Sequence, residues 1–122
     1  MNTKAETIPK QIKIKATSGC LELTYSNGSI YTLSFEFLRV HSPSAEVQGH
    51  GIGSEVLQHG KKRVVIQNIE PVGNYAIKII FSDKHDSGLF TWPLLYKFCQ
   101  NKDTLWEKYL GSLAEAGLNR DI

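Results

Sequence analysis

Apolar and polar residues alternate strictly near the start of the chain. Residues 11–16 place isoleucines on one face and lysines on the other, which predicts a half-buried strand. Residues 20–26 alternate in the same way and predict a second strand. The inner positions expected for this second strand are Leu21, Leu23 and Tyr25.

A hairpin is predicted where this second strand ends. Asn27 and Gly28 both tolerate a positive φ, so the chain should turn there and return as a strand over 30–35. The next segment, 35–40, fits two structures equally well. It can continue the strand, or it can form one helical turn capped by the Ser34 hydroxyl.

A second group of strands follows after a long gap. Residues 63–71 and 75–82 are rich in β-formers, with a turn expected at 70–74, and 89–92 should pair back across a turn at 83–88. In the middle strand of this group, one face carries Ala76, Lys78 and Ile80, and the other carries Tyr75, Ile77, Ile79 and Phe81.

Helical spacing replaces alternation in the last third of the chain. Thr91 can cap a helix that has Pro93 in its first turn, and a second helix should begin near Asp103 or Thr104 and end at Gly117. Because strands come first and helices last, the sequence predicts an α+β fold. Antiparallel hairpins, or one sheet, would pack against C-terminal helices in two layers.

Length and composition indicate one ordinary globular domain. We expect a mobile lead over 1–9, a domain over 10–117 and a short tail over 118–122 within the 122 residues. Cys20 and Cys99 are expected to be reduced and partly buried, because no secretory signal is recognisable. We therefore expect a cytoplasmic protein.

Charge and hydropathy exclude some partners. A net charge of +2 and 21% charged residues do not predict nucleic-acid binding, and no apolar run approaches the length of a membrane span. The short basic run 61–63 fits a solvated strand start or a contact with an acidic partner.

The segment 41–60 is a loop of unusual length and carries candidate metal ligands. His41, His50 and His59 are spaced nine residues apart, which matches no compact ligand motif, and no cysteine lies near them. Solvated loop histidines explain the pattern, although a loop can also bring distant ligands together.

A fourth histidine, His85, lies in a tight turn between Asp83 and Asp86. A carboxylate there could stabilise the turn or orient the imidazole. No G-x-S-x-G nucleophile motif, P-loop or dinucleotide loop is present, so the residues indicate no enzyme class.

Three segments together resemble one family. They are FLRVHSPSAEVQGHG, IEPVGNYAIKIIFSDKHDSGLFTWPLLY and LWEKYLGSL. This combination is similar to the gamma-butyrobetaine hydroxylase-like N-terminal domain, in particular to its small stand-alone bacterial members. The resemblance covers nearly all of the chain, and the run from Asp83 to Trp92 is its most specific part.

The resemblance implies a zinc loop whose ligands have changed. In the hydroxylases this domain holds a structural zinc through the pattern Leu-Arg-x-x-Cys-x-Cys-x-x-Cys and a later histidine. Leu38 and Arg39 match here, whereas the three cysteine positions fall on serine or valine. Those positions are Ser42, Ser44 and Val47, and the histidine position is His85. Serine is a poor zinc ligand beside a thiolate, and valine is none.

The resemblance also bears on activity. The catalytic iron of the hydroxylases belongs to a separate jelly-roll domain, so the likeness does not imply catalysis. Relatives joined to P-loop ATPases that resemble iron–sulfur carriers suggest an adaptor linked to iron–sulfur or redox metabolism. No cofactor is expected, and a protein partner is expected for a monomer or a homodimer.

Three functions remain open from the sequence. The leading one is a non-catalytic accessory or binding domain. The first alternative is iron or zinc binding by His85 with loop histidines, and the second is an oxidoreductase-related enzyme. The binding surface expected for the leading function comprises Arg39, Glu46, His50, Asp83 and Asp86, and the ligands of the metal alternative are His85 with His41 or His50, and Glu46.

Overall fold

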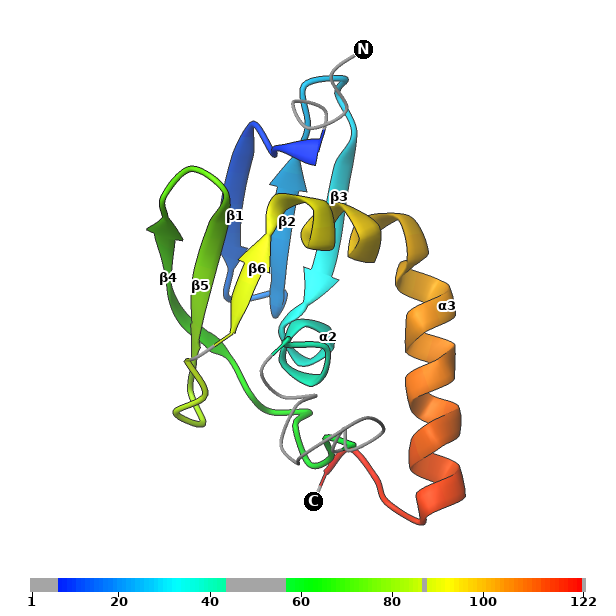
Figure 1. The fold of residues 1–122 in the computed structure, drawn as a ribbon. Helices are drawn as coiled ribbons and strands as arrows, with labels where there is room; N and C mark the ends of the chain where they lie inside the picture. The colour runs from blue at the N-terminus through cyan, green and yellow to red at the C-terminus, as the bar shows by residue number, and fades with distance from the viewer. Residues whose placement is uncertain (1–6, 44–56, 87, 122) are drawn as a thin grey trace, which may run out of the picture.

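The structure, a computed structural model, describes residues 7–43, 57–86 and 88–121. Within these residues the chain forms two antiparallel three-stranded sheets and two helices (Figure 1). The α+β class is therefore confirmed. In chain order the elements are β1 (Gln11–Lys15), β2 (Cys20–Thr24), β3 (Ile30–Ser34), α2 (Phe35–Val40), β4 (Ile66–Val72), β5 (Ala76–Phe81), β6 (Leu89–Thr91) and α3 (Trp92–Ala116).

The first sheet has the order β1-β2-β3 and follows the predicted hairpin. Leu21 pairs with Leu33 across β2 and β3, and both side chains are fully buried. Ile12 packs against the core as expected, but Ile14 is 36% exposed on the edge strand. Alternation therefore predicted the inner face of the central strand better than that of the edge.

The second sheet has the order β4-β5-β6, and the face of β5 that carries Ile77, Ile79 and Phe81 points into the core. Strand β4 differs from the prediction at both ends, because it begins at Ile66 and continues through Pro71 to Val72. The turn predicted at 70–74 is therefore shorter, with Gly73 at φ 55°. Proline is tolerated there because β4 lies at the edge of its sheet, where a strand can lack an N–H donor.

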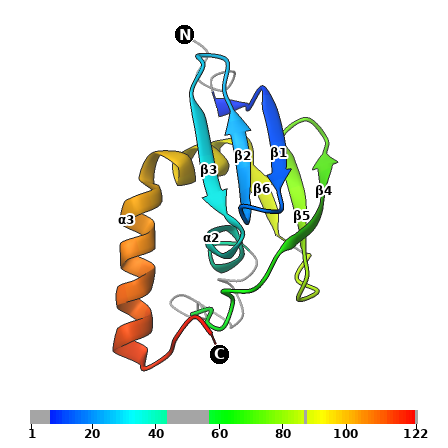
Figure 2. The ribbon, with the colours of Figure 1, turned by 180° about the vertical axis from the view of Figure 1, so that it is seen from behind.

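The two sheets face each other across one apolar core, and α2 closes its lower end (Figures 1 and 2). Burying this many aliphatic and aromatic side chains is the main source of the fold's stability. Its fully buried members include Leu21, Leu23, Leu33, Leu38, Ile79, Phe90 and Leu95.

The ambiguous segment after β3 is helical. The Ser34 hydroxyl accepts a hydrogen bond from the Phe37 backbone N–H at 3.0 Å, as an N-cap should. Every residue of α2 is buried, including Glu36 and Arg39. Such a short helix with two buried charges needs partners elsewhere in the chain.

Helix α3 joins the two predicted helices into one element with a kink. Asn101 leaves helical geometry at φ −122°, and the second part of the helix then descends past α2 (Figure 2). Thr91 caps its start, and Gly117 ends it in the left-handed conformation, as predicted. None of the helices in the described parts of the chain is both long enough and apolar enough to span a bilayer.

Candidate functional site

The end of α2 and the turn between β5 and β6 meet at the lower end of the second sheet. Ser42, which directly follows α2, is fully buried, and its Oγ lies 2.9 Å from Nε2 of His85. Of the four ligand positions that the resemblance implies, these two lie within the described residues. Although 43 residues separate them in the sequence, the fold brings them into hydrogen-bonding contact.

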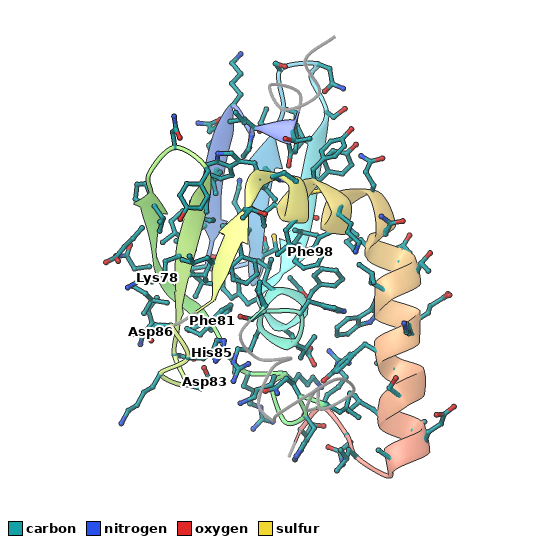
Figure 3. All side chains as sticks on the ribbon, viewed as in Figure 1. Lys78, Phe81, Asp83, His85, Asp86 and Phe98 are labelled. Atoms are coloured by element: carbon teal, nitrogen blue, oxygen red, sulfur yellow. The ribbon has the colours of Figure 1, made fainter. Side chains whose placement is uncertain are left out.

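Asp83, which lies near His85 in Figure 3, joins three parts of the chain. Its Oδ2 accepts hydrogen bonds from Arg39 Nε and from Lys61 Nζ, both at 2.8 Å. Its Oδ1 accepts the His85 backbone N–H at 3.3 Å. Arg39 also donates from Nη1 to the side-chain oxygen of Gln58 at 3.2 Å. The carboxylate therefore links α2, the segment before β4 and the turn.

The turn itself holds His85 in place. The His85 carbonyl accepts the Phe81 N–H at 3.1 Å, and the Phe81 carbonyl accepts the Lys84 N–H at 3.2 Å. Lys84 adopts a φ of 70°, a left-handed conformation that closes the turn. The imidazole lies 6.0 Å from the Phe81 ring, between centroids. Its position is therefore set by the end of β5.

The charges at this cluster are fixed by their surroundings. Burial lowers the pKa of His85, and the positive charge of Arg39 adds to this effect, so the imidazole is neutral at pH 7. Burial alone would raise the pKa of Asp83, but the hydrogen bonds from Lys61 and Arg39 outweigh it and lower the pKa. The acid is therefore ionised.

His41 lies apart from this hydrogen-bonded cluster and faces α2. Its Nδ1 donates to the Phe37 carbonyl at 2.8 Å, and its ring centroid lies 4.3 Å from that of Phe37. The rings of Phe98 and Tyr109 are also close. Burial lowers the pKa of His41. This hydrogen bond fixes the ring but leaves Nε2 as an acceptor, so it is the ring contacts with Phe37, Phe98 and Tyr109 that indicate a packing role.

Only some of the residues expected to form the binding surface are exposed. Asp86 is exposed, whereas Arg39 is 6% exposed and committed to Asp83 and Gln58. Arg39 therefore acts inside the fold, which differs from the role expected for it. Four other expected positions lie outside the described residues: Ser44, Glu46, Val47 and His50.

Lys61 and Gln58 have roles that the sequence did not reveal. The basic run was expected to face solvent or an acidic partner, and Lys61 does meet an acid, but that acid is Asp83 of the same chain. The only sequence signal was a run of like charge ending a long loop.

The donor chemistry does not fit the zinc site that the resemblance implies. The Ser42 hydroxyl replaces a thiolate and is in contact with the histidine that would be a second ligand. Val47 supplies no donor atom wherever it lies. In the described ranges, no three His, Cys, Asp or Glu side chains come close enough together to hold an ion.

Three comparisons relate this chain to known proteins. Residues 12–96 match the model of a family described as gamma-butyrobetaine hydroxylase-like, N-terminal. A search of curated proteins finds no match. An NMR solution structure of one protein is 54% identical and covers 93% of this chain and 90% of its own, with a TM-score of 0.81.

Two further solved structures are similar. Another NMR structure is 49% identical over 92% of this chain and 83% of its own, with a TM-score of 0.78. A crystal structure of a protein of unknown function from Acidithiobacillus ferrooxidans ATCC 23270, of the DUF971 family, is 33% identical. It covers 76% of this chain and 93% of its own, with a TM-score of 0.64. The chain therefore belongs to the gamma-butyrobetaine hydroxylase-like N-terminal domain family.

Proposed function

We propose that this chain is a non-catalytic binding domain whose loop 41–60 is anchored by protein contacts in place of a metal. The observation that carries the proposal is the 2.9 Å contact between Ser42 and His85. Two positions that hold zinc in the family pattern here bind each other. The neighbouring charges of Arg39, Lys61 and Asp83 are likewise used inside the fold.

This arrangement leaves little reactive chemistry at the cluster. A buried serine bonded to a neutral imidazole superficially resembles a nucleophile and its base. However, the Ser42 side chain is fully buried, so its hydroxyl is not accessible to a substrate. The geometry therefore supports a structural link better than it supports hydrolysis.

The binding surface that we propose surrounds this cluster. Asp86 is exposed in the same turn as His85, and the exposed residues His59, Lys62 and Arg63 are close in sequence to Lys61, which binds Asp83. Mixed charges of this kind suit a specific but moderate contact with another protein, since exposed charges contribute selectivity and association rate more than affinity. By analogy with relatives joined to P-loop ATPases, we propose that the partner acts in iron–sulfur or redox metabolism.

Site-specific photo-crosslinking tests the proposal. A photoreactive residue replaces Asp86 in one variant and Lys13, an exposed residue of β1, in a matched control. We expect one partner protein to be captured from cells at position 86 and not at position 13. Capture at neither position, or equal capture of the same proteins at both, would contradict a binding surface at the cluster.

The enzymatic alternative has a separate test. Purified protein is incubated with Fe(II), ascorbate and 2-oxoglutarate, and the release of carbon dioxide is measured. We expect none above the buffer control. Turnover that is lost on replacing His85 with alanine, in protein that remains folded, would instead favour an oxidoreductase.

A further inference from the structure

The buried acid Glu36 binds an arginine from the far end of the described chain. Its carboxylate accepts hydrogen bonds from Arg120 at 2.7, 2.9 and 3.2 Å. The Glu36 side chain is only 6% exposed, while that of Arg120 is 38% exposed. The acid is thus part of the fold, and the arginine approaches it from outside.

Aromatic rings complete this pocket. The guanidinium carbon of Arg120 lies 5.3 Å from the ring centroid of Trp106, within the range of a cation–π contact. The Tyr109 ring lies next to that of Trp106, 5.3 Å away between centroids, and its hydroxyl donates to the Gln58 carbonyl at 2.8 Å. A forked carboxylate contact plus a flat aromatic face matches a planar guanidinium better than an ammonium.

Two backbone hydrogen bonds attach the segment that carries this arginine to the residues before β4. The Gly60 N–H donates to the Asn119 carbonyl, and the Lys62 N–H donates to the Arg120 carbonyl, both at 3.1 Å. Figure 1 shows this segment, in red, returning from α3 to the green segment before β4. Asn119 and Asp121 are exposed. Contacts of this kind open at a lower free energy than a core strand does.

We propose that Glu36, Trp106 and Tyr109 form a guanidinium-binding pocket. Arg120 occupies this pocket as an internal latch. When residues 118–121 detach, an arginine of a partner protein binds in its place. The carboxylate selects a cation, and the forked contact together with the aromatic face commits the pocket to arginine. This inference deepens the proposed function and rests on it, since it gives the chemistry of one partner residue.

A partner arginine must compete with Arg120, which sets a minimum affinity that the partner needs. A tethered group acts at an effective concentration in the millimolar range. A single free arginine therefore cannot displace Arg120, and a partner must add contacts of its own. Removing the latch should expose the pocket to small probes.

The test uses Arg120→Ala protein and N-acetyl-arginine methylamide as the probe, followed by NMR of the Trp106 indole N–H. We expect saturable binding to this variant, at least tenfold weaker binding to the wild type, and at least tenfold weaker binding of the lysine analogue. Adding Glu36→Gln to the variant should abolish binding. Equal binding of the two probes, or no binding to a folded variant, would overturn the proposal.

Arg120→Lys provides an independent test if the alanine variant does not fold. Lysine keeps the charge but loses the fork. Amide hydrogen exchange at Gly60 and Lys62 should become at least tenfold faster, while the Phe35 amide, bonded to the Gly19 carbonyl at 2.9 Å, should not change. Unchanged exchange at Gly60 and Lys62 would show that the fork does not hold the segment. Either failure leaves the crosslinking result at Asp86 unaffected, so the two proposals can fail separately.

Discussion

Replacing Asp83 with alanine should destabilise the fold far more than its partial exposure indicates. The carboxylate is 23% exposed, but the Arg39 side chain that it neutralises is only 7% exposed. Breaking a buried ion pair by removing one partner costs about 3–5 kcal/mol, because the other charge remains buried. Gln58 still accepts one Arg39 hydrogen bond, and Lys61 can turn to solvent, which places the expected loss near 3 kcal/mol.

Urea unfolding followed by tryptophan fluorescence at pH 7 measures this loss. Asp86→Ala, an exposed acid in the same turn, is the matched control and should change the free energy of unfolding by less than about 0.5 kcal/mol. Adding Arg39→Met to Asp83→Ala should restore part of the stability by removing the orphaned charge. If the free energies of unfolding of Asp83→Ala and Asp86→Ala differ by less than about 1 kcal/mol, the linking role of Asp83 is refuted.

Two further predictions concern the core and the histidines. Ile79→Ala, at a fully buried position, should lower the free energy of unfolding by about 2–5 kcal/mol. Ile14→Ala, at a position that is 36% exposed, should lower it by less than about 1 kcal/mol. Similar losses for the two variants in urea unfolding would contradict the assignment of the core. Burial lowers the pKa of His41 and His85, so between their folded values and about 6.5 the unfolded chain binds more protons than the folded one. The free energy of unfolding should therefore be highest above that window and fall as the pH drops from 7 to 5. His41→Phe should reduce the slope of the free energy of unfolding against pH, and an unchanged slope would contradict this.

Local sequence was sufficient to locate the strands and the inner face of the central strand β2. Alternation placed Leu21 and Leu23 correctly, and Asn27-Gly28 marked the hairpin, because both signals depend on neighbouring residues. It failed at Pro71, which reads as a turn residue but lies in an edge strand. Edge position is a property of the sheet and cannot be read from the strand alone.

The helix α2 shows why the remainder could not be predicted. Its sequence suits a strand or a helix, and long-range ion pairs compensate the two charges that the helix buries. Arg39 pairs with Asp83, 44 residues away, and Glu36 with Arg120, 84 residues away. Such partners leave no periodic signal in one sequence. The resemblance related Ser42 to His85, but only the structure shows that the two residues bind each other.

Metal content tests the central claim most directly. The claim is that contacts among Ser42, His85, Arg39 and Asp83 hold the base of the loop without an ion. Elemental analysis of untagged protein, combined with thermal unfolding with and without EDTA, measures this in one preparation. We predict zinc and iron far below one per chain and the same midpoint in both melts. One tightly bound ion per chain, together with a lower melting point after chelation, would contradict the account.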